Sequence, residues 1–249
     1  MTGSEPLLRT ERLSKWFGSF VALTEVSLAI MPGEVRGVIG PNGAGKSTLF
    51  NLISGHLKPS SGSVFYRGER ISGLAPHAVA RRGVARKFQI AQIFSSLRVD
   101  ENVSLAAFQD GTPSIAGLLR PRVVREKVDE TLRRVRLVDR RNEEAASLSH
   151  GEQQRLELAM VLATGAPLLL LDEPTAGMSS EERAVMAEVI REVAATRTIL
   201  IVEHDFVFIK TVADRVTVLD NGRTLAEGPL EAIENDEAVR EIYLGRDDA

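Results

Sequence analysis

The sequence predicts an α/β fold with a parallel-sheet core, an N-terminal antiparallel β subdomain and a helical insertion. The first observation is a glycine-rich loop, residues 40–48, between an apolar strand at residues 35–39 and a helix. The second is a pair of strands at residues 168–172 and 198–202, apolar except for Asp172 and Thr198, on either side of a helix expected at about 180–195. Apolar strands that alternate with helices are typical of a parallel sheet covered on both faces.

Shorter elements follow along the chain. Alternating segments at residues 7–13 and 26–30 predict strands in the opening third, and a further strand pair is expected at 63–66 and 69–71. Near the end, two short apolar runs flank Asn221-Gly222. This dipeptide predicts a hairpin, because Asn-Gly tolerates the positive φ angles of a tight turn.

The middle of the chain, from about residue 89 to 162, is expected to be a mostly helical insertion. Its evidence is one apolar helix face with spacings of four, four and three residues, formed by Val124, Val128, Leu132 and Val135. We therefore expect a single domain over residues 1–249. Its core would comprise about 1–88 and 163–249.

The loop at residues 40–48 is a complete G-x-x-x-x-G-K-[ST] motif and predicts a nucleoside triphosphate site within a RecA-like P-loop NTPase core. Its glycines let backbone N–H groups point at phosphates, and the following helix N-terminus adds partial positive charge. Lys46 would reach the β- and γ-phosphates, and Ser47 would ligate Mg²⁺. A structural turn with a surface lysine is the weaker interpretation. The expected binding residues are Gly40, Pro41, Asn42, Gly43, Ala44, Gly45, Lys46, Ser47 and Thr48.

Two adjacent carboxylates, Asp172 and Glu173, end the strand at residues 168–172. Open α/β sheets bind ligands at the carboxyl ends of their strands. Asp172 would hold Mg²⁺ opposite Ser47, and Glu173 would orient or deprotonate the water that attacks the γ-phosphate. The alternative is that these acidic residues simply close a strand and begin a turn.

Residues 148–155 precede a helix that is expected to run to about Ala163. Ser149 with Glu152 three residues later forms an ordinary capping box, which by itself explains both residues. A second hypothesis is that this helix N-terminus, with Gly151 allowing close approach, is another anion site. Local chemistry leaves both open.

The composition narrows the class of partner. The net charge is −3, which argues against nucleic acid as the main partner. The chain has no cysteine, so disulfides are excluded and an intracellular, reducing compartment is the simplest expectation. No apolar run approaches the roughly 18 to 20 residues of a membrane span. A membrane role would therefore depend on a partner.

Together, these motifs resemble the nucleotide-binding subunit of an ATP-binding cassette (ABC) transporter over essentially the whole chain. Residues 149–152 resemble the family signature, with His150 in place of its first glycine and Glu152 in place of its glutamine. The resemblance implies that Ser149 and Gly151 contact the γ-phosphate of ATP held by a second subunit. It also implies ATP and Mg²⁺ as cofactors and a Mg²⁺-dependent ATPase activity.

The resemblance assigns roles to three further side chains. Phe17 would stack on adenine, with a core aromatic as the alternative. Gln89 would reach Mg²⁺ and the attacking water, and His204 would hydrogen-bond the γ-phosphate. In isolation, Gln89 would be a solvated loop residue and His204 a structural or exposed one. Residues 175–178 occupy the place of the dimer-contact loop, and 89–97 could line the groove for the membrane subunit, or be plain core.

Several motifs resemble the importer ATPases for branched-chain amino acids and for urea or short amides. They are Phe88-Gln89, Leu148-Ser149-His150-Gly151, Ala176-Gly177-Met178, Val202-Glu203-His204-Asp205 and Ile242-Tyr243-Leu244-Gly245. This implies integral membrane permease partners, a second ABC ATPase that is either identical or paralogous, and indirectly a solute-binding protein. The location would be the cytoplasmic face of the inner or plasma membrane. The alternatives are a lipopolysaccharide-transport ATPase, a soluble ABC ATPase and a non-hydrolysing regulatory module.

Overall fold

The computed structural model describes residues 5–87, 93–107 and 121–244. The strands are β1 (Leu8–Phe17), β2 (Phe20–Ile30), β3 (Val35–Ile39), β4 (Ser61–Tyr66), β5 (Glu69–Arg70), β6 (Val84–Lys87), β7 (Leu168–Asp172), β8 (Thr198–Val202), β9 (Arg215–Asp220) and β10 (Arg223–Pro229). The helices are α1 (Lys46–Ile53), α2 (Pro76–Arg81), α3 (Val99–Ala107), α5 (Pro121–Arg134), α6 (His150–Ala163), α7 (Ser180–Ala194), α8 (Phe206–Val212), α9 (Leu230–Glu234) and α10 (Glu237–Leu244). Two short 3₁₀ helices are η1 (Val138–Arg140) and η2 (Ala145–Ser147).

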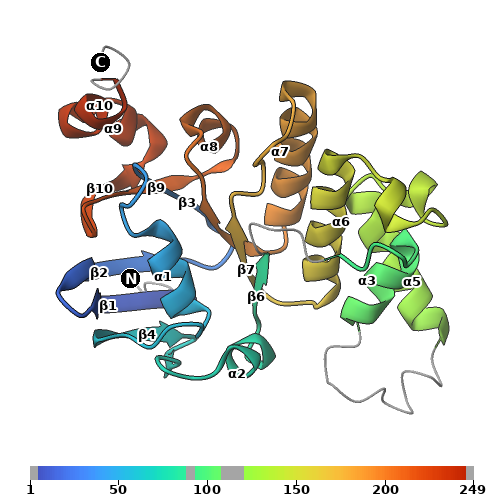
Figure 1. Ribbon diagram of the computed structural model, residues 1–249, viewed down its shortest axis with the longest axis horizontal. Coiled ribbons are helices and arrows are strands. Elements are labelled where there is room, and N and C mark those ends of the chain that lie inside the picture. Colours follow the sequence, from blue (N-terminus) through green and yellow to red (C-terminus); the bar gives the residue numbers. More distant parts are fainter. Residues whose placement is uncertain (1–4, 88–92, 108–120, 245–249) are drawn as a thin grey trace.

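Within these residues the strands form two sheets (Figure 1). The smaller sheet is antiparallel, with the order β2-β1-β4-β5. The larger has the order β10-β9-β3-β8-β7-β6, in which only the β9–β10 hairpin is antiparallel. The predicted α/β class, with a parallel core sheet and an N-terminal antiparallel sheet, is confirmed.

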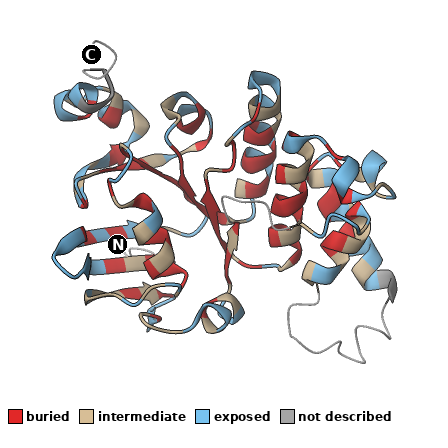
Figure 2. Cartoon of the chain, viewed as in Figure 1, coloured by how far each residue is buried: buried red, intermediate tan, exposed pale blue. Residues whose placement is uncertain are grey.

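The centre of the larger sheet is buried on both faces. Every residue of β3, β7 and β8 is buried, and these strands lie in the red centre of Figure 2. Because successive side chains in a strand point to opposite faces, Leu169 and Leu171 join the core that includes α6 and α7. Leu168 and Leu170 join the core that includes α1 and the antiparallel sheet. The C-terminal ends of these strands therefore lie between two packed layers.

The described residues between β6 and β7 are mostly helical and lie beside the sheet (Figure 1). Helix α3 packs against α5 and α6. On α5, the predicted apolar face is confirmed, because Val128 and Leu132 are buried and Val124 packs against the same core. The first boundary of the insertion, at residues 88/89, lies outside the described residues. The division of the chain at 88/89 and 162/163 stays a prediction.

The N-terminal hairpin is longer than the sequence predicted. Strands β1 and β2 remain paired as far as Phe17 and Phe20, whereas strands were expected only at 7–13 and 26–30. Register shifts between Thr10 and Trp16 interrupt the simple alternation on which that prediction depended. The C-terminal hairpin is confirmed, and Asn221 and Gly222 have φ angles of 45° and 75°.

Strand β6 carries two charged residues, of which Lys87 is buried and Arg86 is largely so. The Lys87 ammonium is fully buried and donates to Gln154 Oε1 at 2.5 Å, and it lies 3.0 Å from Glu157 Oε2. Both partners lie on α6. The preceding residue, Arg86, contacts the opposite side, toward α1 and β7. Two consecutive side chains of β6 therefore join the sheet to both of its neighbouring layers.

Candidate functional site

The loop between β3 and α1 depends on glycine at positions where backbone passes close by. Gly45 is the N-cap of α1 with a φ of 100°, and a Cβ on it would lie 2.7 Å from the Ala22 carbonyl oxygen. A Cβ on Gly40 would lie 2.1 Å from the Leu219 carbonyl oxygen. The loop is thus held between β2 and the end of β9. It presents the first-turn N–H groups of α1, which have no acceptor inside the helix.

Lys46 begins α1 and turns back over the loop. Its Nζ donates to the carbonyl oxygens of Gly40 at 2.6 Å and Pro41 at 3.0 Å, and the residue is 7% exposed. Burial lowers the pKa of Lys46, and nearby carboxylates partly oppose that effect. The opposing charges belong to Glu173, Asp172 and Glu203. The lysine therefore lies where the loop, β7 and the end of β8 converge.

Asp172, the predicted metal ligand, ends β7 and is almost fully buried. Its Oδ2 accepts a hydrogen bond from Arg86 Nη2 at 2.8 Å. The other terminal nitrogen of Arg86 donates to Asn51 Oδ1 at 2.7 Å and Ser54 Oγ at 3.1 Å, both on or next to α1. Arg86 therefore fixes the carboxylate at the end of β7 relative to α1.

Glu173, the predicted base, has a left-handed backbone with a φ of 43°. Its N–H donates to the Val202 carbonyl oxygen at 2.9 Å, at the end of β8. A residue other than glycine in this conformation costs free energy and requires support from its surroundings. The turn directs the chain away from the sheet directly after Asp172, at the edge where the phosphate loop lies.

The next residues of this turn contact a carboxylate that follows β8. Glu203 is fully buried, and its Oε1 accepts hydrogen bonds from the Thr175 N–H at 3.1 Å and the Thr175 hydroxyl at 2.6 Å. Its Oε2 accepts from the His204 N–H at 3.3 Å. Burial raises the pKa of Glu203, and the bonds from Thr175 oppose the rise. The His204 side chain itself is 62% exposed, so it projects from this fixed point.

The N-terminus of α6 has the predicted capping box. Ser149 Oγ accepts from the Glu152 N–H at 3.2 Å, and Glu152 Oε2 accepts from the Ser149 N–H at 2.9 Å. A second carboxylate, from Glu182 in the first turn of α7, lies against the same helix end. Its Oε1 accepts from the Gly151 N–H at 3.1 Å and the Ser149 hydroxyl at 3.3 Å. The helix end thus binds an anionic group from its own chain.

His150, which departs from the family signature, contacts the turn that follows β7. Its Nε2 lies 2.9 Å from the Ala176 carbonyl oxygen, at hydrogen-bond distance. A Cβ on Gly177 would lie 3.0 Å from the same nitrogen. The helix nonetheless begins regularly at His150. The substitution therefore places a side-chain contact between α6 and the predicted dimer-contact loop.

The remaining predicted residues are Phe17 and Gln89. Phe17 is 47% exposed at the end of β1, with Lys15 Nζ 5.0 Å from its ring centre, so the alternative of a core aromatic is wrong. Gln89 lies outside the described residues, as do residues 90–92 of the segment 89–97. Within the described part of that segment, Phe94 is 52% exposed and Ile93 packs against the core that includes α6, so the groove role of the segment stays a prediction. The roles expected for Phe17 and Gln89 stay predictions.

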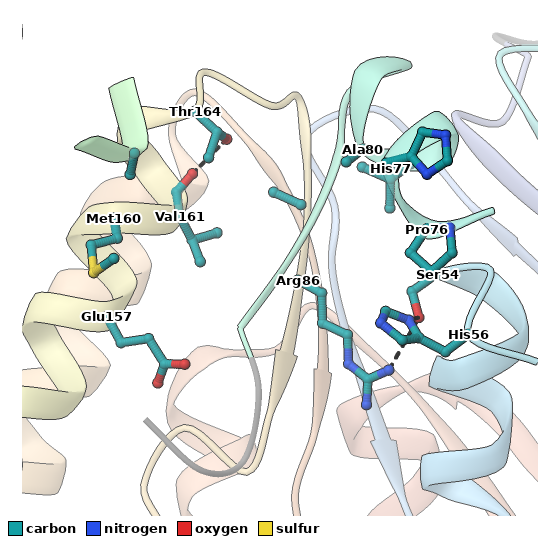
Figure 3. Close-up of a pocket in the computed structure, with 13 residues that line it drawn as sticks. Ser54, His56, Pro76, His77, Ala80, Arg86, Glu157, Met160, Val161 and Thr164 are labelled. Atoms are coloured by element: carbon teal, nitrogen blue, oxygen red, sulfur yellow. Dashed lines mark hydrogen bonds between the residues drawn. The ribbon is translucent and has the colours of Figure 1, made fainter. Parts of the chain in front are cut away.

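A groove of about 360 Å³ opens between α6 on one side and α2 and β6 on the other (Figure 3). Its apolar lining comprises Ala80, Val84, Ala85, Met160 and Val161. Arg86 and His56 also line it, and Arg86 reaches Ser54 there. Burial lowers the pKa of His56, and the charge of Arg86 adds to that effect. Because Arg86 also binds Asp172, one side chain connects the groove to the end of β7.

The donor set suits Mg²⁺ held jointly with phosphates. Magnesium takes oxygen ligands and is usually bound through one or two carboxylates plus substrate phosphates. Asp172 at the end of β7 supplies a carboxylate, and the exposed Ser47 in the first turn of α1 supplies a hydroxyl. Among the described residues, no group of three or more His, Cys, Asp or Glu side chains could hold a metal ion alone.

Three contacts were missed from sequence: Arg86 on Asp172, Glu182 on the α6 N-terminus, and Glu203 on Thr175. The clue to the first contact was a charged pair next to apolar residues. The clue to the second was another Ser-x-x-Glu pattern at the start of α7, and the clue to the third was a carboxylate directly after a run of apolar strand residues.

In the described part of the chain, no helix is long and apolar enough to cross a membrane.

Comparisons with known proteins agree with this geometry. A family profile described as ABC transporter matches residues 23–176, and one described as branched-chain amino acid ATP-binding cassette transporter matches 223–249. The chain is 37% identical over 252 residues to the high-affinity branched-chain amino acid transport ATP-binding protein LivG of Escherichia coli K12. It is 34% identical over 252 residues to BraF of Pseudomonas aeruginosa. Each match covers 97% of this chain and 99% of the relative.

Solved structures give the same answer. The ADP conformation of MJ1267, an ATP-binding cassette of an ABC transporter, matches with a TM-score of 0.84 and 31% identity over 97% of this chain and 99% of that chain. A dimeric post-hydrolysis state of the cassette MJ0796, bound to ADP and phosphate, matches with a TM-score of 0.75 and 26% identity over 90% of this chain and 98% of that chain. The resemblance is therefore confirmed, and the chain belongs to the ABC transporter family of ATP-binding and ATP-hydrolysing subunits.

Proposed function

We propose that this ATPase powers an importer for branched-chain amino acids or a related solute such as urea or a short amide. The observation that carries the proposal is the match of the whole chain to LivG and BraF, whose names state branched-chain amino acid transport, together with the profile over residues 223–249. The two carboxylates at the end of β7, next to the phosphate loop, supply the groups that hydrolysis requires.

In the proposed site, the phosphates of ATP lie against the α1 N-terminus, where Lys46 turns from the loop carbonyls to the β- and γ-phosphates. Ser47, Asp172 and Gln89 would hold Mg²⁺, which neutralises phosphate charge when bound. Glu173 orients the attacking water and accepts its proton. His204 donates a hydrogen bond to the γ-phosphate, and Phe17 stacks on the adenine.

A second ATPase subunit completes each site. Ser149 and Gly151 at the α6 N-terminus would bind the γ-phosphate held by the partner, and the two chains would be related by a two-fold axis with two ATP molecules between them. ATP would then attract both subunits, and its hydrolysis would remove the contacts that favour the closed pair. The pair consists of two copies of this chain or of this chain and a paralogue.

The membrane partners we propose are permease subunits, which would hold this chain at the cytoplasmic face of the membrane. The groove between α6 and β6 supports this, because it presents apolar side chains from both elements. Through Arg86, a protein seated in the groove would be connected with Asp172. A solute-binding protein would act indirectly, on the outer side of the permease.

The test is to purify the tagged chain from gently solubilised native membranes with Mg-ATP and to identify its companions by mass spectrometry. We expect multi-span proteins, together with a solute-binding protein whose ligand can be measured directly by calorimetry. Companions of the lipopolysaccharide-export type, or only soluble factors, would overturn the importer proposal and leave the ATPase activity in place.

A further inference from the structure

We propose that Glu203 is a positioning residue for ATP hydrolysis, whose buried carboxylate joins the turn that follows Glu173 to the loop that carries His204. This inference rests on the roles proposed above for Glu173 and His204. Glu203 itself does not touch the nucleotide. Its effect would pass through the two loops that it holds, which meet at the edge of the sheet beside the phosphate loop.

The two carboxylate oxygens of Glu203 serve different loops. Oε1 accepts both hydrogen bonds from Thr175, at 3.1 and 2.6 Å, so it fixes the turn two residues after Glu173. Oε2 accepts the His204 N–H at 3.3 Å and lies 3.8 Å from His204 Nδ1. One rigid, planar group therefore sets the separation between the proposed base and the proposed γ-phosphate donor.

The backbone around this carboxylate is fixed to the neighbouring strands. The Glu203 N–H donates to the Val38 carbonyl oxygen at 3.3 Å, two residues before the phosphate loop begins at Gly40. The Glu173 N–H donates to the Val202 carbonyl oxygen at 2.9 Å. Consequently, the ends of β3, β7 and β8 are mutually tied, and the Glu203 side chain extends this order into the loops beyond them.

A buried carboxylate would cost folding free energy at a position that only fills space. Glu203 and Thr175 are 0% and 5% exposed, and burying an ionisable group costs free energy unless hydrogen bonds compensate. Apolar side chains occupy the four preceding positions of β8, residues 199–202. The change from apolar residues to a buried glutamate occurs where the chain leaves the sheet for the site. This placement favours a role in holding the loops over a role in the core.

The decisive variant is Glu203→Gln in the full-length chain. The amide oxygen can still accept from Thr175, whereas the amide nitrogen facing the His204 N–H would put two donors together, so only the His204 side is disrupted. We expect kcat to fall about 10- to 100-fold, the scale of a misplaced catalytic group. The Kd for a fluorescent ATP analogue should change by no more than about twofold, because the ground-state contacts remain.

Thr175→Val tests the other side of the same carboxylate, since it removes the hydroxyl donor and keeps the backbone N–H and the volume. The control is Thr10→Val on β1, where a similarly buried hydroxyl donates to the Val26 carbonyl oxygen and also accepts from the Leu28 N–H. Both variants should lower Tm. Only Thr175→Val should also lower kcat, by an amount smaller than Glu203→Gln.

Glu173→Gln, measured in the same assay, separates two kinds of failure. If Glu173→Gln abolishes turnover while Glu203→Gln keeps a kcat within about twofold of wild type, the positioning role is wrong and the proposed site stands. If Glu173→Gln turns over normally, the proposed site is wrong. A Glu203→Gln protein that loses Tm like Thr10→Val, with kcat per folded molecule unchanged, would make Glu203 purely structural and also overturn the inference.

Discussion

The N-termini of α1 and α6 are both suited to anions, but the chain treats them differently. Helix α1 begins after Gly45 with no side-chain cap, and its first turn has no acidic residue. Helix α6 begins after Ser149 with a full capping box, and the Glu182 carboxylate accepts from the Gly151 N–H. One helix end is left for a phosphate, whereas the other is already satisfied within the chain.

This difference indicates how the two ends would bind ATP. At α1, a phosphate meets donors that need no rearrangement beyond a turn of the Lys46 ammonium away from two carbonyl oxygens. At α6, a phosphate from a partner subunit must compete with the Glu182 carboxylate for the same N–H and hydroxyl. The first site is therefore expected to bind ATP in the single chain, and the second only when the chain rearranges.

The largest effect should come from Glu173→Gln, which leaves both helix ends intact. We expect ATP binding to persist and turnover to fall about 10²- to 10⁴-fold, because a positioned acid–base group is lost. Steady-state phosphate release and equilibrium nucleotide binding measure the two quantities. Near-normal hydrolysis would remove Glu173 from its proposed role. The variant also allows binding at both helix ends to be studied without hydrolysis.

In that background, Ser149→Arg should abolish ATP-induced dimerisation while nucleotide binding to the monomer is unchanged. The substitution removes the hydroxyl and places a long side chain where the partner's phosphate would lie. Light scattering after size-exclusion chromatography measures the mass. Ser149→Ala removes the hydroxyl without added bulk, so dimerisation should weaken less. A normal dimer of the arginine variant would mean that α6 does not bind the partner's nucleotide.

Glu182→Gln tests the competition directly. The amide can still cap α7, since glutamine also serves in a capping box, but the charge at the α6 N-terminus is lost. The interaction of a negative charge with a helix N-terminus contributes about 0.3–1 kcal/mol. Because the partner's phosphate would no longer compete with this charge, the ATP concentration for half-maximal dimerisation should fall about two- to fivefold. Glu181→Gln, one residue earlier and exposed, is the control and should have no effect. A higher required ATP concentration would show that Glu182 supports the dimer.

The smallest expected effect is on stability. Hydrogen bonds from the N–H groups of Ser179 and Gly151 and from the Ser149 hydroxyl lower the pKa of Glu182, although partial burial opposes them. The ionised group therefore stabilises the fold above the ordinary glutamate pKa of about 4.3, and this contribution disappears as pH falls through the lowered pKa. Wild type should exceed Glu182→Gln in Tm by about 1 °C at pH 7 and by nothing near pH 2. Calorimetry of both proteins at both pH values measures this difference in Tm.

The parts of the site that could be predicted from the sequence are those formed by residues close together in the chain. The loop at 40–48, the carboxylates that end β7, and the capping box of α6 each depend on residues within ten positions of one another. For this reason their spacing alone specified both the element and its end. The α5 face and the Asn221-Gly222 turn were predictable on the same grounds.

Contacts between distant segments could not be predicted in this way. Arg86 and Asp172 are 86 residues apart, and Glu182 and Gly151 are 31 apart. Strand β6 itself was missed because half of its residues are charged, and only the packed structure shows that Arg86 and Lys87 are neutralised by partners on opposite sides. Propensity and periodicity contain no information about such pairs.

The Lys87–Glu157 pair limits how α6 can move. Both groups are almost fully buried. Removing one partner of a buried ion pair typically lowers the free energy of unfolding by about 3–5 kcal/mol. Helix α6 is therefore anchored near its middle to the edge strand of the sheet. Sliding of α6 along the strand would separate this pair, so we expect the pair to oppose it. A displacement of Ser149 that preserves the Lys87–Glu157 contact would therefore have to leave the helix in place two turns further along.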